Sequence, residues 1–306
     1  MEIDERPIHS QNGFHLAGVI PVAGQPLDFK MDWPDCMMPV APDYTMIEAA
    51  IHECLWAGCD TVWIVCNDDL APLVRYRVGD YGEDPVWASR RFSPNPREQR
   101  KQIPIFYVPI HPKDRDRRDC LAWSVLHGAL TCLKVTSKIS KWLIPDKYYV
   151  SFPYGLFPPE ELRPLRQKIA TMRNFYVTYG GETVENNHFC SFTFGKEDFI
   201  KYRRIIRKEG TGLYTTEVVD ERGIPRSRLP IEQRWSARFF DLKKVFRDLD
   251  TEQSMTYEPS WFYNLGNWED YKQFLGSENS KEIARPWERI LRYREFNPIG
   301  VDTEED

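Results

Sequence analysis

Two short, continuously apolar segments enclose a helix-forming segment near the start of the chain, and this order restricts the fold more than any other feature. Leu16–Gly24 ends in glycine, and Thr61–Asn67 is rich in β-branched residues. Between them, apolar residues recur at helical spacing over Met46–Leu55, with Thr45 as a candidate N-cap and Gly58 as a stop. Strands without a polar face are typical of parallel sheets. The pattern predicts a right-handed βαβ unit and an α/β fold with a mainly parallel central sheet flanked by helices.

The rest of the chain first continues this alternation of buried strands and helices, and its later strands have an antiparallel pattern. Two more buried strands are predicted, at Ile103–Ile110 and Lys147–Phe152. Later segments alternate in the manner of antiparallel strands, at 175–181 and 188–194. Helices are expected at 120–133, 158–172, 196–210, 239–249 and 268–276. No repeat or low-complexity linker interrupts the series, so one domain is expected over 1–280, followed by a C-terminal helix and acidic tail over 281–306.

Composition excludes several classes of protein. The formal net charge is −5, whereas proteins that coat nucleic acids usually have a basic surface, so no nucleic-acid partner is expected. No apolar stretch approaches the ~18 residues of a transmembrane helix, and the polar, acidic start differs from a signal peptide. The seven cysteines include no C-x-x-C pair, which favours buried free thiols over zinc or redox chemistry. These features predict a cytoplasmic protein without a membrane partner, which could form a homo-oligomer or join an assembly.

Three stretches, in this order along the chain, carry a resemblance to a known family. They are AGVIPVAG, then WPDCMMPVAPDYTMIEAAIHECLWAGCDTVWIVCN, and finally WFYNLGNWEDYKQFL. The first looks like an opening strand with its glycine-rich nucleotide loop. The second is similar to a run of Pro-Lys, apolar-Pro-Val, helix, Ala-Gly and strand, and the third to Trp-x-Asp-x-Gly-Thr-x-Glu-Asp-Tyr. In these stretches the chain resembles the sugar-nucleotide pyrophosphorylases, which are nucleotidyltransferases.

The resemblance implies a GT-A-like fold of the nucleotide-diphospho-sugar transferase type, with the nucleotide over the carboxyl ends of the early strands. It implies a nucleoside triphosphate or sugar nucleotide as ligand, and Mg²⁺ as the cofactor of an active enzyme. The implied reaction is attack by a sugar phosphate on the α-phosphorus of the triphosphate, with release of pyrophosphate. The implied nucleotide-binding residues are Ala23, Gly24 and Gln25, and Lys30 lies in the same loop.

The sequence departs from the family at the positions that bind phosphate and metal ions. The family's Pro-Lys pair is Pro34-Asp35 here, so an acid stands at the position of a phosphate-binding lysine. The family's second metal-binding Asp corresponds to Asn264, which supplies a carbonyl oxygen without a charge. The first metal-binding Asp has no counterpart after the strand that ends at Phe152. Asp35 and Asn264 are therefore the expected catalytic positions, substituted in this chain.

Charged and glycine-containing loops supply further candidates. The segment HPKDRDRRD precedes a predicted helix, and its cations could meet phosphate at Lys113, Arg115, Arg117 and Arg118. A solvated mixed-charge loop is the alternative for the same segment. The resemblance implies sugar contacts at Gly180, Gly181 and Glu182, where a hairpin turn is an equal alternative. The candidate metal ligands are Asn264, Asp114 and Asp116.

Three functions remain open from the sequence. The first is transfer of a nucleotidyl group from a triphosphate to a sugar phosphate or similar acceptor. The second is a catalytically degenerate relative that binds a nucleotide or sugar nucleotide, or serves as a structural or assembly subunit. The third is a glycosyltransferase on the same fold, for which Asp114-Arg115-Asp116 has the spelling of a metal-binding motif. The substituted charges leave open whether the chain is an enzyme.

Overall fold

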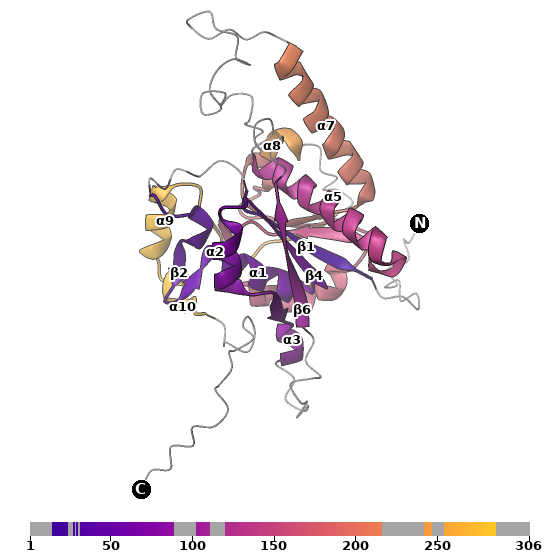
Figure 1. Ribbon diagram of the computed structural model, residues 1–306. Coiled ribbons are helices and arrows are strands. Elements are labelled where there is room, and N and C mark those ends of the chain that lie inside the picture. Colours follow the sequence, from indigo (N-terminus) through magenta and orange to yellow (C-terminus); the bar gives the residue numbers. More distant parts are fainter. Residues whose placement is uncertain are drawn as a thin grey trace, which may run out of the picture.

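The structure is a computed structural model that describes residues 14–23, 27, 29, 31–88, 102–110, 120–215, 242–246 and 254–285 (Figure 1). The strands are β1 (Leu16–Pro21), β2 (Pro39–Ala41), β3 (Tyr44–Thr45), β4 (Thr61–Cys66), β5 (Tyr81–Glu83), β6 (Gln102–Pro109), β7 (Lys147–Val150), β8 (Gly155–Leu156), β9 (Phe175–Val177), β10 (Phe192–Phe194), β11 (Met255–Tyr257) and β12 (Tyr263–Asn264). The α-helices are α1 (Met46–Ala57), α2 (Ala71–Val78), α3 (Pro85–Ala88), α5 (Leu121–Ile139), α6 (Arg166–Ile169), α7 (Lys196–Thr215), α8 (Leu242–Val245), α9 (Trp268–Leu275) and α10 (Asn279–Glu282). The short 3₁₀ helices are η1 (Asp35–Met37), η3 (Lys141–Leu143), η4 (Pro159–Leu165) and η5 (Val184–Asn186).

The centre of the molecule is an 8-stranded sheet with the order β11-β9-β10-β7-β1-β4-β6-β5. Its middle strands β7, β1, β4 and β6 are all parallel, and β1 pairs with β4 from Ala17↔Thr61 to Pro21↔Val65. The opening strand therefore occupies the interior of the sheet, where both faces are covered and every residue of β1 is buried. The predicted α/β fold with a mainly parallel central sheet is confirmed.

Helix α1 has the boundaries that its sequence predicts. Thr45 is the N-cap, and its backbone N–H donates to the carboxylate of Glu48 at 3.0 Å, as in a capping box. Gly58 ends the helix at a φ of 90°, a left-handed conformation that glycine adopts without a Cβ clash. The helix is buried on almost every side, and even Glu48, His52 and Glu53 are inaccessible. It is therefore an interior helix rather than an amphipathic surface helix.

Helices cover both faces of the sheet, and close approach on each face depends on a small residue. On one face, α5 presents Gly128 to Val19 and Val65, whose side chains would lie within 2.8 Å of any added Cβ. On the other face, Gly18 of β1 faces the side chain of Cys54 on α1. Adjacent β1 residues point to opposite faces, so α1 and α5 lie on opposite sides of the sheet. Figure 1 shows α5, α7 and α8 together on the α5 side.

The antiparallel half of the sheet follows the sequence less closely. β10 runs antiparallel to both β7 and β9, as the alternating patterns predict. Helix α7 continues to Thr215, so the predicted stop at Gly210 is wrong. The predicted helix at 158–172 begins as the 3₁₀ helix η4, because Pro164 interrupts α-helical hydrogen bonding, and becomes α-helical only at α6.

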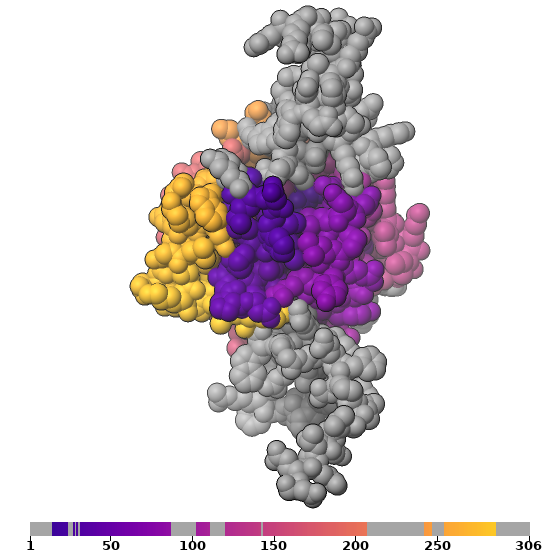
Figure 2. Space-filling model, turned by 60° about the vertical axis from the view of Figure 1, so that its left-hand side comes forward, coloured from indigo at the N-terminus to yellow at the C-terminus, as the bar shows by residue number. Residues whose placement is uncertain are grey.

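The C-terminal segment 254–285 packs against the early part of the chain, and Figure 2 shows it in yellow beside the indigo and purple surface of residues 31–88. β12 pairs with β8 at Asn264↔Gly155. Arg285 forms ion pairs with Asp43 and with Glu48 of α1. α10 crosses the expected boundary at residue 280, and the division into 1–280 and 281–306 remains a prediction because 286–306 lies outside the described residues.

All seven cysteines are free and buried, as their sequence surroundings predict. They lie on both sides of the sheet and in the loops that follow it: Cys36, Cys54, Cys59, Cys66, Cys120, Cys132 and Cys190. None of the helices in the described residues has the length and apolar character that crossing a membrane requires.

Candidate functional site

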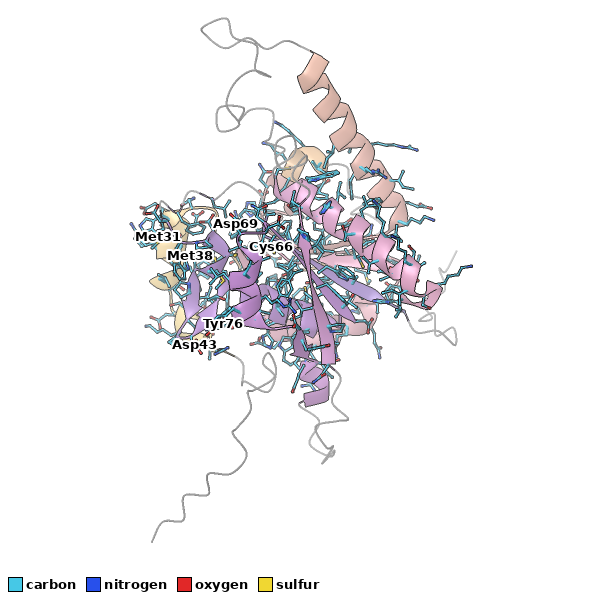
Figure 3. The ribbon with its side chains drawn as sticks, in the orientation of Figure 1. Met31, Met38, Asp43, Cys66, Asp69 and Tyr76 are labelled. Atoms are coloured by element: carbon cyan, nitrogen blue, oxygen red, sulfur yellow. The ribbon has the colours of Figure 1, made fainter. Side chains whose placement is uncertain are left out.

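The parallel strands end together at one edge of the sheet. The backbone N–H groups of Val22 and Ala23, just after β1, both donate to the carbonyl of Val65 in β4, at 2.8 and 2.7 Å. In Figure 3, Cys66 at the end of β4 and Asp69 beyond it lie on the same flank as Met31 and Met38. Because ligands of open α/β sheets bind outside the carboxyl ends of the strands, this edge is the candidate site.

Ala23 lies at this edge, but its backbone is already hydrogen-bonded. Its N–H bonds Val65, and its carbonyl accepts the hydroxyl of Ser124 on α5. Ala23 thus fixes the end of β1 between β4 and α5 and presents no free N–H to a phosphate. The other expected nucleotide-binding residues, Gly24, Gln25 and Lys30, lie outside the described residues and remain predictions.

Asn67 is a polar residue at the same edge that the sequence pattern did not single out. It follows β4 directly, and its backbone carbonyl accepts the N–H groups of Leu70 and Ala71, which starts the turn into α2. Within the described part of the chain, its buried Oδ1 has no hydrogen-bond partner. A buried amide oxygen without a partner is costly, and its presence beside the end of β1 indicates a place for a ligand donor. The sequence feature that could have indicated Asn67 is a polar residue directly after a continuously apolar strand.

Asp35, the acid at the family's lysine position, holds the loop that follows β1. Its carboxylate accepts the backbone N–H of Leu27 at 2.6 Å. Burial raises the pKa of Asp35, and the bond from Leu27 opposes that rise. Burial, with smaller contributions from Cys36 and Asp35, raises the pKa of Tyr154 well above its ordinary value. Asp35 therefore lies near Tyr154, just beyond β7, at the candidate edge.

Asn264 also lies near Tyr154. Its neighbour Leu265 donates its N–H to the Tyr154 carbonyl at 2.7 Å. The Oδ1 of Asn264 accepts the N–H of Phe189 at 2.8 Å, and the Phe189 ring contacts the Tyr154 ring at 5.3 Å. Asp35 and Asn264 thus both lie near Tyr154, and their catalytic role remains a prediction. One carboxylate oxygen of Asp35 and the amide oxygen of Asn264 each accept a hydrogen bond from a backbone N–H, of Leu27 and Phe189 respectively.

A cavity of about 380 Å³ opens beside Asn264. Tyr179 and Trp261 form part of its wall, and α9 contributes Asp270 and Gln273. Tyr179 begins the hairpin 179–182, which contains the expected sugar contacts. The cavity is therefore lined by Asn264 and by the first residue of the hairpin, whereas the expected sugar contacts Gly180, Gly181 and Glu182 are not among its lining residues.

The hairpin itself is a tight two-residue turn. Tyr179 and Glu182 exchange backbone hydrogen bonds at 3.1 and 3.0 Å. Gly180 and Gly181 have φ values of 57° and 80°, which is the pairing that a type I′ turn requires. An added Cβ would meet nothing within 4 Å at either glycine, so the turn alone explains both. Their role in sugar binding remains a prediction.

Comparison with known proteins bears on the fold. No protein-family model matches the sequence, and no curated protein matches it either. A protein from Bacillus anthracis described as a glucose-1-phosphate thymidylyltransferase, in complex with sucrose, superposes with a TM-score of 0.51 at 10% identity, over 89% of this chain and 97% of its own. A UDP-glucose pyrophosphorylase in complex with UDP-glucose gives a TM-score of 0.51 at 13% identity, over 88% of this chain and 100% of its own. This chain has the sugar-nucleotide pyrophosphorylase fold.

At these identities the likeness establishes the pyrophosphorylase fold and leaves the chemistry to the residues of this chain. The resemblance read from the three sequence stretches is confirmed at the level of the fold. A third match, the manganese complex of Rv0371c from Mycobacterium tuberculosis H37Rv, has a TM-score of 0.42 at 13% identity and is too distant to bear on metal binding.

The described residues of this pyrophosphorylase fold do not fit Mg²⁺ at the family positions. Asn264 is neutral and its Oδ1 already accepts the Phe189 N–H, whereas Mg²⁺ prefers carboxylate oxygens in near-octahedral geometry. In the ranges that the structure describes, no three His, Cys, Asp or Glu residues come together so as to hold a metal ion. The remaining metal candidates Asp114 and Asp116 lie outside those ranges, as do the phosphate candidates Lys113, Arg115, Arg117 and Arg118.

The hydrogen bond of Asn264 gives a direct prediction. We expect Asn264→Ala to lower the free energy of unfolding by about 1–3 kcal/mol, because the N–H of buried Phe189 loses its acceptor. Asn264→Asp should stay close to the parent, since a carboxylate accepts the same N–H. Urea denaturation of the three proteins measures both effects. Equal losses in Asn264→Ala and Asn264→Asp would contradict this role.

Proposed function

We propose that this chain binds a nucleotide or sugar nucleotide at the carboxyl edge of its sheet. The base lies against Asn67, and the sugar end reaches the cavity lined by Asn264 and Tyr179. The proposal concerns binding alone.

The observation that carries the proposal is the unpartnered amide oxygen of Asn67. It is buried at the end of β4, beside the chain that leaves β1. Every nucleobase edge offers hydrogen-bond donors or acceptors, and an exocyclic amino group or ring N–H supplies the donor that Oδ1 lacks. A binding site also explains why a folded chain tolerates this residue, since an apolar residue of the same size would cost less.

The cavity beside Asn264 supports the sugar end of the proposal. Its polar wall residues include Asp270, Gln273 and Asn279, and its aromatic ones include Tyr179, Trp261 and Phe262. Amide, carboxylate and aromatic groups together suit a hydroxylated ring, which offers donors and acceptors at its edge and C–H groups on its faces. About 380 Å³ is within the size range of small-ligand pockets.

Replacement of Asn67 by leucine tests the proposal. We expect Asn67→Leu to bind UDP-glucose or the preferred nucleotide at least about tenfold more weakly, while its melting temperature without ligand stays equal or rises. The two readouts separate a binding residue from a structural one, because a structural residue would lose stability. A thermal-shift panel of nucleoside triphosphates and sugar nucleotides, with and without Mg²⁺, identifies the ligand. A ligand at 100 times its Kd should stabilise the parent by about 2.7 kcal/mol.

The matched control is Asn186→Leu, because Asn186 is exposed in η5 and does not line the Asn264 cavity. It should leave ligand affinity unchanged. If no compound of the panel raises the melting temperature of the parent protein, the proposal is overturned and a structural or assembly role is favoured. If Asn67→Leu loses stability but keeps its affinity for the ligand, Asn67 is not part of the binding site.

Nucleotidyl transfer is a second candidate, favoured by the described elements on either side of the basic stretch of the sequence. β6 ends at Pro109 and α5 begins at Leu121, both at the carboxyl edge, while the candidates Lys113 and Arg118 between them lie outside the described residues. In this reaction an acceptor phosphate oxygen bonds to the α-phosphorus, and the bond to pyrophosphate breaks. Measurement of pyrophosphate release with Mg²⁺ and a panel of sugar phosphates decides between binding alone and turnover.

A further inference from the structure

A second cavity, of about 330 Å³, lies on the α1 side of the sheet. Helix α1, the segment 155–160 that follows β7, and residues 282–285 form its walls. Trp261 also contributes, and this residue lines the Asn264 cavity as well. Asn67 and Ala23 do not line it, so this cavity is separate from the proposed nucleotide edge.

Two adjacent polar residues of α1 contribute to the lining of this cavity. His52 is 6% exposed, and within the described residues its Nε2 has no hydrogen-bond partner. Burial lowers the pKa of His52 to about 3, so the ring is neutral at physiological pH. Glu53 is 3% exposed, and its two oxygens accept the hydroxyls of Tyr149 and Ser151, each at 2.7 Å. The lining therefore includes one residue with an unpartnered imidazole nitrogen and one with an anchored carboxyl group.

The rest of the lining is aromatic and acidic. Tyr44, Phe157 and Trp261 supply aromatic walls, and the exposed residues Glu160 and Glu282 supply carboxylates. Arg285 is the cationic residue of the lining; its two Nη atoms pair with Asp43 and Glu48, and its buried Nε has no hydrogen-bond partner within the described residues. The acidic groups therefore dominate the charge that faces the cavity.

We propose that this cavity is a binding site for a small organic ammonium ion, held between its aromatic walls and the carboxylates of Glu160 and Glu282, with His52 as its buried hydrogen-bond acceptor. An ammonium group carries several N–H donors and no acceptor, which matches a lining rich in acceptors. The faces of Trp and Tyr rings attract cations. A neutral His52 accepts at Nε2 in the tautomer that has its proton on Nδ1, and it adds no positive charge that would repel the ligand.

The chemistry disfavours the other small-molecule classes. An anion would meet the exposed carboxylates of Glu160 and Glu282, and the charge of the one arginine in the lining is already shared with Asp43 and Glu48. A neutral polyol could hydrogen-bond to the same groups but would gain nothing from the charge or from the ring faces. Binding should therefore follow the charge of the ligand at constant size.

Three probes of equal chain length test this dependence: putrescine, 1,4-butanediol and succinate. Isothermal titration calorimetry at about 0.15 M salt screens non-specific attraction to an acidic protein. We expect putrescine to bind at one site, with a Kd at least about tenfold below that of 1,4-butanediol, and succinate not to bind. Equal affinity for putrescine and 1,4-butanediol, or no binding of putrescine, would overturn the proposal.

Two variants locate the binding. Glu160→Gln changes an exposed residue, so it should fold normally and weaken putrescine binding by about fivefold. The matched control is Glu269→Gln, on α9 outside the cavity, where the side chain is 73% exposed. His52→Leu should abolish binding and keep or raise the melting temperature, because it removes a buried nitrogen without a partner. Equal effects of Glu160→Gln and Glu269→Gln would show non-specific attraction and contradict the site. None of these measurements requires a nucleotide.

Discussion

Gly155→Ala is expected to lower the free energy of unfolding by about 3 kcal/mol, because the added methyl group has no space. A Cβ at this position would overlap the carbonyl oxygen of Phe189 and lie 2.9 Å from its carbonyl carbon. These are backbone atoms, and the N–H of the same residue is held by Asn264. Asn264 in turn pairs with Gly155 across β8 and β12. Relief of the clash must therefore separate the strands that carry the wall between the two cavities.

Gly195→Ala is the matched control for Gly155→Ala. Gly195 has no atom within 4 Å of a built Cβ and no positive φ. Alanine there should change the free energy of unfolding by less than about 1 kcal/mol, since the smaller entropy of the unfolded chain is its main effect. Chemical denaturation of both variants measures the difference. Similar stabilities for Gly155→Ala and Gly195→Ala would contradict the close approach of Phe189.

Arg166→Met is expected to cost about 3–5 kcal/mol, because it removes a cation that pairs with a buried carboxylate. Asp84 is 2% exposed, and its carboxylate lies 3.0 Å from the Arg166 guanidinium. The same Nη2 donates to the carbonyl of Leu55 at 2.9 Å, in the last turn of α1. Arg166 thus satisfies a C-terminal carbonyl of α1 and neutralises Asp84 at once. Thermal and urea denaturation measure the loss.

Two control variants distinguish the effect of a buried ion pair from the effect of losing any ion pair. Arg75→Met removes a pair of similar length, 2.8 Å to Asp80, but both side chains are exposed, and we expect a loss of at most about 1 kcal/mol. The double variant Asp84→Asn/Arg166→Met removes the charge as well as its partner and should recover part of the stability that Arg166→Met loses. A double variant no more stable than Arg166→Met would show that the pairing of Asp84 is not the cause.

The sequence predicts the parallel half of the fold well, because its signals are local. Continuously apolar strands such as Leu16–Pro21 and Thr61–Cys66, separated by a capped helix, leave few alternatives to a βαβ unit. The antiparallel half depends on contacts between distant segments. The pairing of β8 with β12 joins two-residue strands about a hundred residues apart, which no local pattern reveals. Helix α7 passes Gly210 because a glycine costs a helix only about 1 kcal/mol.

The candidate site was predictable in outline only. The resemblance led to Asp35 and Asn264, which both lie near Tyr154 in the structure, but their bonds to Leu27 and Phe189 depend on the tertiary fold. His52 and Glu53 could not be singled out from the sequence, because apolar residues at helical spacing define one buried face of α1 and do not show that its other side is buried as well. Once the helix is known to be interior, two adjacent polar residues within it require partners or a ligand.

Because every cysteine is buried, the rate at which the thiols are alkylated reports how often the protein opens. Alkylating reagents attack the thiolate, and burial raises the pKa of Cys66 and Cys190 to about 12 and that of Cys36 and Cys132 further still. The native protein should therefore react slowly at neutral pH, and each opening of the core should expose thiols to irreversible labelling. Mass spectrometry of partly alkylated protein would then order the regions around the sheet by how often they open, without any engineered probe.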